Sequence, residues 1–422
     1  MFDMFKRRGF RTPWHLRVLY LSTFLLRTAF GALLLLITAY FVDDSDGLLK
    51  VAIIAVPYPL AEMATANYFG ILSDRIGRKP IIVAGTTLAA GIVALYALSS
   101  NVWYLTALHG IHGIGAAATV APAIAMIADH AREEDRGRQM GWFDYSTFLG
   151  YILGAVVGGF LMRYVMPQIG FLIVAVVLAA SAIMLYTLVK KEQVVRKAER
   201  VSGFTELRNV FKIREVRLIF PIWLIIATLL GLALTYLPII MRSQNVEGTT
   251  IGIMFGLAGV ALGLLQPFWG KVSDIVGRIP VMAYGVFSIA GIVTMLLLFP
   301  NSAINVTPDG IDFNPIGLIP LAILGLGAGA FVPSALAMMA DSSKSESYGA
   351  TMGLYSFALG FGAFLAESVG LVIIWSTGSD KAPGWILYFA AALVGLAVFL
   401  MVVFFIVSVI RKRPDRNKAR VS

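Results

Sequence analysis

Ionisable residues inside long apolar runs are the first candidates for chemistry in this chain. Arg27 follows the start of one run and Glu62 precedes the end of the next, so both are expected at a similar depth from the same side of the membrane. A charge in the middle of a bilayer is costly, so such a residue usually faces a cavity and has a partner. We therefore expect Arg27 and Glu62 to form an ion pair, in which Glu62 takes up a proton or binds a cationic solute. A purely structural ion pair is the alternative.

Three further ionisable residues extend this set. His109 and His112 are three positions apart, so they share one face of a helix, and histidine titrates near physiological pH. A packed, neutral histidine is the alternative for each. Glu367 is the acid inside an apolar run of the second half of the chain. The side chains that we expect nearby as possible substrate contacts are Phe30, Tyr58, Tyr236, Gln266 and Tyr355.

A short charged loop occurs twice along the chain. The segment GILSDRIGRKP at 70–80 recurs in altered form as GKVSDIVGRIP at 270–280. Long apolar runs flank each copy, which predicts a duplicated membrane protein. Asp129 and Asp341 also stand in matching segments, and their separation (341 − 129 = 212) exceeds that of the two loops (274 − 74 = 200). About a dozen residues are therefore inserted between the two matching pairs, and the polar segment 301–315 is the expected place.

The first loop has the form G-x-x-x-D-R-x-G-R-K, which closely resembles the loop signature of the major facilitator superfamily of transporters. The resemblance covers nearly the whole chain. It implies that Asp74 lies at the N-terminus of the eleventh helix, near Gly349, where free N–H groups and the helix dipole favour an anion. Gly70 and Gly77 are expected to allow close helix approach and a tight turn.

The same resemblance implies an ion pair between Arg78 and Asp129, and by symmetry one between Arg278 and Asp341. Such pairs would hold the cytoplasmic side closed and break when it opens. The alternative is that the loop cations only fix the topology of the chain. The gating residues that we expect are Gly70, Asp74, Arg75, Gly77, Arg78, Asp129, Asp274, Arg278 and Asp341.

Two other helices carry a resemblance to the same superfamily. His109 stands where its fourth-helix motif has an arginine that, in proton-driven members, tunes a proton site. Gly150, Gly154 and Gly158 are spaced four apart, which permits close helix contact. Their segment resembles the antiporter signature of drug exporters, although that signature has proline where this chain has Ala155.

Composition places the chain in a membrane. Of its 422 residues, 58% are hydrophobic and 14% are charged, and the mean hydropathy is +0.82. A soluble chain would be about a quarter charged, so the excess apolar surface has to face lipid. A helix needs about 20 apolar residues to cross the bilayer. Twelve such segments are expected, at 16–42, 48–72, 80–99, 102–128, 140–164, 167–189, 217–241, 250–273, 280–300, 316–340, 349–376 and 384–410.

The expected fold class is an all-α membrane protein with twelve transmembrane helices in two pseudo-symmetric six-helix bundles. Residues 1–189 form the first bundle and 217–410 the second. The basic segment 190–216 is a cytoplasmic linker, and 411–422 a basic cytoplasmic tail. In the superfamily that the chain resembles, the halves are related by an axis along the membrane normal, and substrate binds between them.

The distribution of charge argues against nucleic acid as a partner, despite a net charge of +10. The lysines and arginines gather in alternate loops and at the termini, which is the positive-inside pattern. We therefore expect a plasma-membrane protein with both termini in the cytoplasm. With no cysteine and four scattered histidines, we expect no metal and no cofactor. The cations outside the alternating set are Arg27, Lys50, Arg163, Arg242 and Lys381.

These features predict a transporter and no enzymatic activity. We expect a monomer that exports lipophilic or amphipathic, drug-like compounds by alternating access, with a proton gradient as the energy source and membrane lipid around it. One alternative is a lipid or lysolipid translocator of the same fold. Another is an importer of a carboxylate metabolite, in which Arg27 binds the carboxylate. A receptor or scaffold built on a transporter fold is the third.

Overall fold

Twelve membrane crossings are present in the computed structural model. It describes residues 13–41, 43–130, 136–189, 211–243, 246–263, 265–299, 304–307, 310–342 and 348–412. Within these ranges, 11 helices are long and apolar enough to span a bilayer. The shorter apolar helix Gly248–Val260 belongs to the remaining crossing. The predicted fold class is therefore confirmed. Most of the predicted linker 190–216, the basic start of the chain and most of the basic tail lie outside the described residues.

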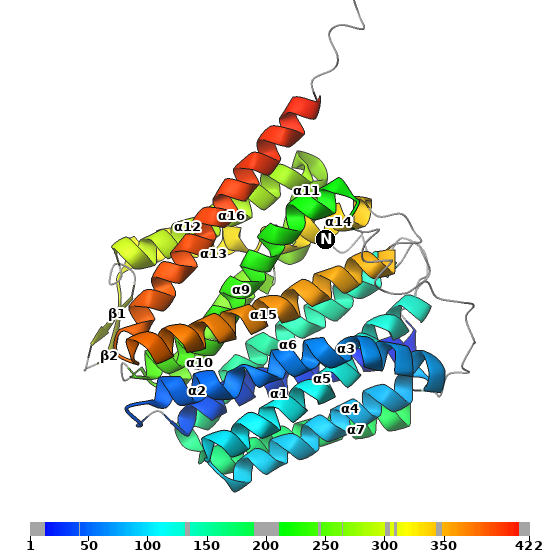
Figure 1. Cartoon of the computed structure of the whole chain (residues 1–422), viewed down its shortest axis with the longest axis vertical. Coiled ribbons are helices and arrows are strands. Elements are labelled where there is room, and N and C mark those ends of the chain that lie inside the picture. The colour runs from blue at the N-terminus through cyan, green and yellow to red at the C-terminus, as the bar shows by residue number, and fades with distance from the viewer. Residues whose placement is uncertain are drawn as a thin grey trace, which may run out of the picture.

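The first half of the chain forms six crossings (Figure 1). Its elements are α1 (Trp14–Ala39), α2 (Gly47–Ala55), α3 (Pro57–Ile76), α4 (Arg78–Leu95), a 3-10 turn (Tyr96–Leu98), α5 (Val102–His130), α6 (Arg136–Tyr164) and α7 (Pro167–Leu188). The second crossing consists of α2 and α3, with a break at Val56. Pro57 follows the break and has no N–H to donate to the preceding turn.

The second half repeats this arrangement. Its helices are α9 (Arg214–Ser243), α10 (Gly248–Gly263), α11 (Gln266–Val276), α12 (Arg278–Leu298), α13 (Pro315–Ala328), α14 (Phe331–Ser342), α15 (Tyr348–Thr377) and α16 (Ala382–Lys412). The eighth and tenth crossings, predicted as single segments, are each broken in two. Pro267 and Pro333 stand in the first turn of α11 and α14, where proline is tolerated but the preceding helix has to end.

The insertion predicted at 301–315 contains a small sheet. Strand β1 (Ile304–Thr307) pairs antiparallel with β2 (Gly310–Phe313), in the register Ile304↔Phe313 to Thr307↔Gly310. This hairpin joins α12 to α13 outside the helical bundle (Figure 1). The extra residues of the second half thus leave the twelve crossings unchanged.

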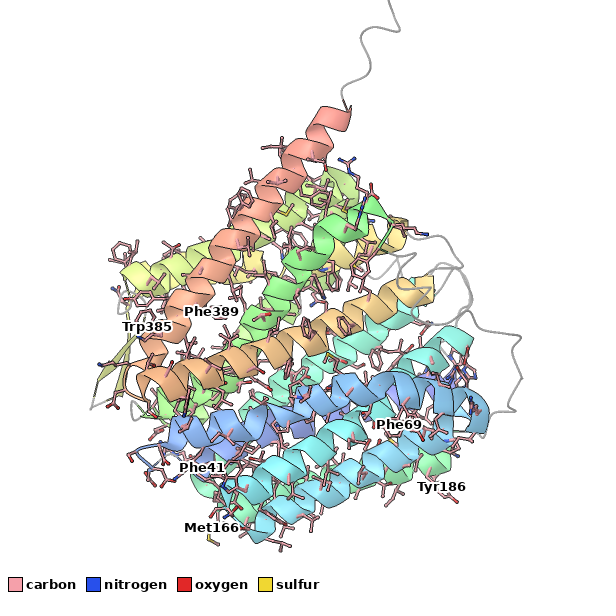
Figure 2. The ribbon with its side chains drawn as sticks, viewed as in Figure 1. Phe41, Phe69, Met166, Tyr186, Trp385 and Phe389 are labelled. Atoms are coloured by element: carbon pink, nitrogen blue, oxygen red, sulfur yellow. The ribbon has the colours of Figure 1, made fainter. Side chains whose placement is uncertain are left out.

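Two ends of the molecule can be distinguished, and we name them the charged-loop side, which carries residues 70–80 and 270–280, and the opposite side. Aromatic residues concentrate at both membrane–water interfaces. Figure 2 shows Phe69 and Tyr186 at the first end and Phe41, Met166 and Trp385 at the second. Strongly exposed aromatics lie near these levels, which fits two interfacial belts: Trp14, Trp103, Tyr164, Tyr186, Trp375 and Trp385.

The two halves meet on the opposite side. There α6 packs on α10 so closely that a Cβ on Gly252 would lie 2.7 Å from the carbonyl oxygen of Ala155. Arg163 at the end of α6 forms an ion pair with Glu247, just before α10. Towards the charged-loop side the halves diverge, and α11 packs on α12 and α14 of its own half (Figure 1). The helices of the two halves therefore contact each other on the opposite side and spread apart towards the charged loops (Figure 1).

Candidate functional site

Arg27 is the centre of a polar group inside the first half. Its Nη1 atom donates to the hydroxyl of Tyr151 at 3.1 Å, and its guanidinium carbon lies 5.5 Å from the centroid of that ring. The Phe30 ring contacts the rings of both Tyr151 and Tyr58. Gly150 leaves room for this arrangement, since a Cβ there would lie 2.6 Å from the Cβ of Arg27. Among the described residues, the buried Nε of Arg27 has no partner.

Glu62 interacts with the charge of Arg27 without bonding to it. It lies one helical turn after Tyr58 on α3. Its carboxylate interacts electrostatically with the guanidinium of Arg27. No ion pair within 4.0 Å joins the two in the described part of the chain, so the prediction of direct contact is wrong. The side-chain hydrogen bond of Arg27 goes to Tyr151 instead. Glu62 can therefore gain or lose a proton without breaking a bond to Arg27.

The two histidines differ in their surroundings. The Nδ1 atom of His109 lies 2.7 Å from the hydroxyl of Tyr96, so this residue matches the packed, hydrogen-bonded alternative. His112 is equally buried, but its Nδ1 has no partner among the described residues. The Tyr58 ring lies 5.3 Å from His112 and 4.8 Å from Phe30. We define the Arg27 centre as Arg27, Phe30, Tyr58, Glu62, His112 and Tyr151.

Glu367 on α15 brings the second half to this centre. The side chain is buried, and its Oε1 accepts a hydrogen bond from Thr235 on α9 at 3.2 Å. Helix α15 packs on α3, the helix that carries Glu62. Tyr236 is fully buried and donates to the main-chain oxygen of Glu367 at 2.7 Å. The prediction that Tyr236 contacts substrate is thus not supported, because its hydroxyl holds α9 against α15.

The two other predicted contacts in the second half remain open. Gln266 is half-buried at the first position of α11. The side chain of Tyr355 lies outside the described part of the structure. Both stay predictions as substrate contacts.

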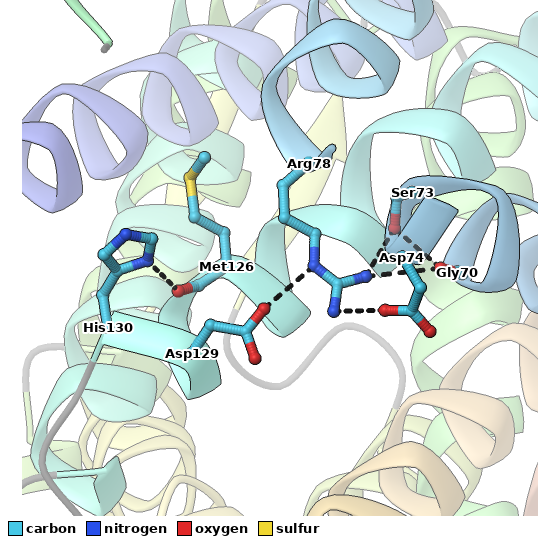
Figure 3. Close-up of polar contacts among 7 residues, drawn as sticks. All are labelled: Gly70, Ser73, Asp74, Arg78, Met126, Asp129 and His130. Carbon is cyan, nitrogen blue, oxygen red and sulfur yellow. Dashed lines mark hydrogen bonds and ion pairs between the residues drawn. The ribbon is translucent and has the colours of Figure 1, made fainter. Parts of the chain in front are cut away.

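The first charged loop forms a cluster around Arg78 (Figure 3). Its Nε donates to Asp129 Oδ2 at 3.1 Å, and its Nη1 donates to Ser73 Oγ at 2.7 Å. Nη2 forms an ion pair with Asp74. The same Nη1 also donates to the Gly70 carbonyl at 3.3 Å. The predicted pair of Arg78 and Asp129 is confirmed, and Arg78 itself is buried.

The second loop repeats the pairing of the cluster, although here Nη1 makes the ion pair with the loop aspartate. Arg278 Nε donates to Asp341 at 3.0 Å, Nη1 donates to Ser273 at 2.7 Å, and Asp274 forms the second ion pair. The predicted pair of Arg278 and Asp341 is therefore confirmed, although its acids are more exposed than those of the first loop. Each cluster joins helices of a single half, and both are intact while the halves diverge beside them. Their predicted role as a gate between the halves stays a prediction.

Some details of the loops differ from expectation. Gly77 has φ 102°, a conformation that favours glycine, so the predicted tight turn is confirmed. A Cβ on Gly70 would meet open space, so close helix approach is wrong there, and its carbonyl is what the cluster uses. Arg75 is exposed to the surroundings. The contact of Asp74 with the start of α15 is not tested, since side chains around Gly349 lie outside the described residues.

The sequence interpretation missed three features. Ser73 and its counterpart Ser273 complete the clusters, and their presence before the aspartate in both copies was the available signal. Tyr151 follows the glycine that admits Arg27, and nothing in the sequence distinguished it. Arg163 was one of the cations outside the alternating loops, but its partner Glu247 could not be identified without the fold.

Comparison with known proteins agrees with this geometry. The family model described as Major Facilitator Superfamily matches residues 19–304 and 225–421. The proton-coupled antiporter flippase LtaA of Staphylococcus aureus (strain MSSA476) is 26% identical over 350 residues, covering 81% of this chain and 82% of LtaA. The nucleoside transporter NupG has a TM-score of 0.70 at 14% identity, covering 93% of this chain and 98% of NupG. The human organic anion transporter MFSD10 has a TM-score of 0.67 at 18% identity, with coverages of 92% and 100%. The last two show the fold alone, and together with the family model they lead to one conclusion: the chain belongs to the major facilitator superfamily.

Proposed function

We propose that this protein is a proton-coupled transporter of amphipathic molecules that works by alternating access. The observation that carries the proposal is the Arg27 centre, which places a cation and an acid inside the membrane without an ion pair between them. Such residues mark ion and substrate pathways in membrane proteins. The similarity to LtaA, named a proton-coupled antiporter flippase, supports both the coupling and a lipid as cargo.

Proton coupling follows from the freedom of Glu62. When Glu62 is ionised, its charge balances that of Arg27, and when it is protonated the centre carries the charge of Arg27 alone. The change requires no hydrogen bond of Arg27 to break, because that bond goes to Tyr151. A proton therefore changes the attraction of the centre for a charged headgroup without dismantling the site.

The character of the cargo follows from the contrast between the halves. On α15 of the second half, three stacked rings lie along one helical face. Phe357 and Phe361 are 5.6 Å apart, Phe361 and Phe364 are 6.3 Å apart, and Phe357 is 45% exposed. A polar headgroup would bind at Arg27 and an apolar chain along this row. A charged group from the first half and aromatic rings from the second suit an amphipathic molecule better than a sugar.

The direction of transport follows from the charged loops. By the positive-inside rule, the charged-loop side lies in the cytoplasm. The conformation described above is then open to the cytoplasm and ready to receive cargo from that side. Export, driven by protons that enter from outside, is the proposed direction, and a single chain carries the whole pathway.

Transport by purified protein in liposomes tests the proposal. We expect an imposed proton gradient to drive movement of a fluorescent lipid between leaflets, and Glu62→Gln to abolish the effect of the gradient. Asp380→Asn, which neutralises an exposed acid at the opposite side, is the matched control and should behave as wild type. Movement that ignores both the gradient and Glu62→Gln would reject the coupling.

The same preparation separates the rival cargoes. A cationic dye in place of the lipid tests drug export, and a gradient-driven dye flux with no lipid movement would favour it. Arg27→Ala should abolish binding of an anionic headgroup but only alter coupling for a cationic cargo. Uptake of a small carboxylate that depends on Arg27 would identify an importer instead.

A further inference from the structure

A groove between α12 and α13 lies in the second half, away from the Arg27 centre. Its walls are formed by residues between Ala290 and Phe299 at the end of α12 and between Asn314 and Leu324 at the start of α13. Its volume is about 560 Å³, and most of its lining is apolar. Binding sites for small ligands have volumes of about 300–1,000 Å³ and are lined mainly by apolar groups. The groove is therefore large enough to hold a ligand.

Both walls of the groove belong to membrane crossings. The apolar spans Arg278–Leu298 and Ile316–Met339 contain nearly all of its length. The side chains at and beside the groove on α13 are strongly exposed, Ile316 at 84% and Ile319 at 62%. Exposed apolar side chains on a membrane-crossing helix face lipid. The groove therefore opens to the hydrocarbon of the bilayer.

The length of the groove matches one leaflet of a bilayer. Its lining spans nine residue steps on α12 (299 − 290 = 9) and ten on α13 (324 − 314 = 10). At 1.5 Å per residue, the groove is about 14–15 Å long. The hydrocarbon core of a bilayer is about 30 Å thick, so each leaflet contributes about 15 Å. One extended acyl chain of a single leaflet therefore fits the length of the groove.

The two ends of the groove differ. At the inner end α12 and α13 come into contact, because a Cβ on Gly291 would lie 2.7 Å from the Cδ2 atom of Leu324. At the other end Phe299 and Asn314 stand where α12 ends and α13 begins, next to the hairpin on the opposite side (Figure 1). The groove is therefore closed towards the middle of the membrane and open at the interface of the opposite side.

Polar groups lie at the open end. Pro320 has no N–H, so the carbonyl of Ile316, four residues earlier, lacks its usual donor within α13. Both residues line the groove. The Oδ1 atom of Asn314 accepts the N–H of Ile316 at 3.1 Å, so the amide N–H groups of Asn314 can donate elsewhere. One acceptor and one pair of donors thus stand beside an apolar groove.

We propose that this groove binds one phospholipid of the leaflet on the opposite side, with an acyl chain between α12 and α13. The amide of Asn314 donates to an ester or phosphate oxygen of the lipid, and a hydroxyl of its headgroup donates to the carbonyl of Ile316. A glycerol headgroup supplies that hydroxyl, because an unmet carbonyl at the edge of the hydrocarbon is costly. The site is independent of the proposed transport function, since none of its residues belongs to the Arg27 centre.

Native mass spectrometry measures the occupancy of this site. The whole protein, purified in detergent and freed of lipid, is titrated with phosphatidylglycerol. We expect one molecule to bind more tightly than all later ones. Thr294→Phe places a ring in the groove and should weaken binding of this tightest lipid at least tenfold. Ala322→Phe adds the same ring at an exposed position of α13 outside the lining, so it is the matched control and should bind as wild type.

A second variant tests the polar end without filling the groove. Pro320→Ala restores an N–H for the carbonyl of Ile316, so the lipid loses one hydrogen bond and should bind about 2- to 12-fold more weakly. Phosphatidylcholine has no hydroxyl to donate, so it should bind wild type and Pro320→Ala equally. Equal binding of the tightest lipid by wild type and Thr294→Phe overturns the site. Equal binding of phosphatidylglycerol by wild type and Pro320→Ala overturns the role of the carbonyl. Because no transport is measured, failure of the liposome assay leaves this result unaffected.

Discussion

Gly252→Ala should weaken the closed contact on the opposite side. Gly252 on α10 faces α6, where an added Cβ would lie 2.7 Å from the Ala155 carbonyl oxygen, 3.1 Å from the Gly159 Cα and 3.2 Å from the Val156 carbonyl oxygen. All three are backbone atoms, so no side chain can rotate away. The clash can be relieved only if α6 and α10 move apart, and these helices belong to different halves.

The size of the effect follows from the cost of overpacking. Adding a methyl group to a tight contact costs about 1–3 kcal/mol, which corresponds to a change of about 5–150-fold in a conformational equilibrium. Alanine also has a higher helix propensity than glycine, by about 1 kcal/mol. That gain applies to α10 in both conformations, so it cancels from their ratio. The conformation open on the opposite side should therefore gain population.

Labels at Leu98→Cys and Trp375→Cys, both strongly exposed near the opposite side, would report this opening as a longer distance. Gly360→Ala is the matched control, because a Cβ there meets open space within a helix. The control should leave the distance distribution unchanged. If Gly252→Ala behaves like the control, the contact between α6 and α10 does not limit opening and the reasoning is wrong.

Further predictions concern the charged contacts. Arg163→Ala should shift the same distance only slightly, because its pair with Glu247 is exposed and such pairs contribute about 0–1 kcal/mol; a shift as large as that of Gly252→Ala would contradict this. Ser73→Ala removes a buried hydrogen bond to Arg78 and should cost about 1.5–3 kcal/mol in unfolding assays. Gly77→Ala forces a Cβ into positive φ and should cost about 1–2 kcal/mol, measured the same way; a neutral result for either would show that the loop relaxes.

The loop clusters could be predicted in detail because their residues lie in short segments between long helices. Once the chain was read as a duplicated bundle, Arg78 and Asp129 had to meet at the same end of neighbouring helices, and the same held for Arg278 and Asp341. The superfamily resemblance supplied the pairing. The extra serine in each cluster was visible in both copies, but a hydroxyl between an apolar and an acidic residue has many possible uses.

The centre of the membrane was less predictable. The depth of Arg27 and Glu62 could be predicted from the rise of a helix, but the rotation of either helix about its axis could not. Direct pairing was therefore the simplest expectation, but the guanidinium of Arg27 hydrogen-bonds Tyr151 instead. The same ambiguity explains Tyr236, whose aromatic ring fits a cavity wall or a helix contact equally well by sequence. The contact of α15 with α3 depends on how the halves pack, which no local pattern encodes.

Helix α6 has an additional consequence for how the carrier changes shape. Gly158 meets Ala32 of α1 within its own bundle, while the very next residue, Gly159, meets Gly248 and Gly252 of the other. Helix α6 thus has one contact surface within its own bundle and another towards the opposite bundle, and the two begin at adjacent residues. Rotation of α6 about its own axis would break its contact with α1. The two helices therefore have to move together as one rigid body. This geometry favours rigid-body rocking of one half against the other, without rotation of individual helices about their axes.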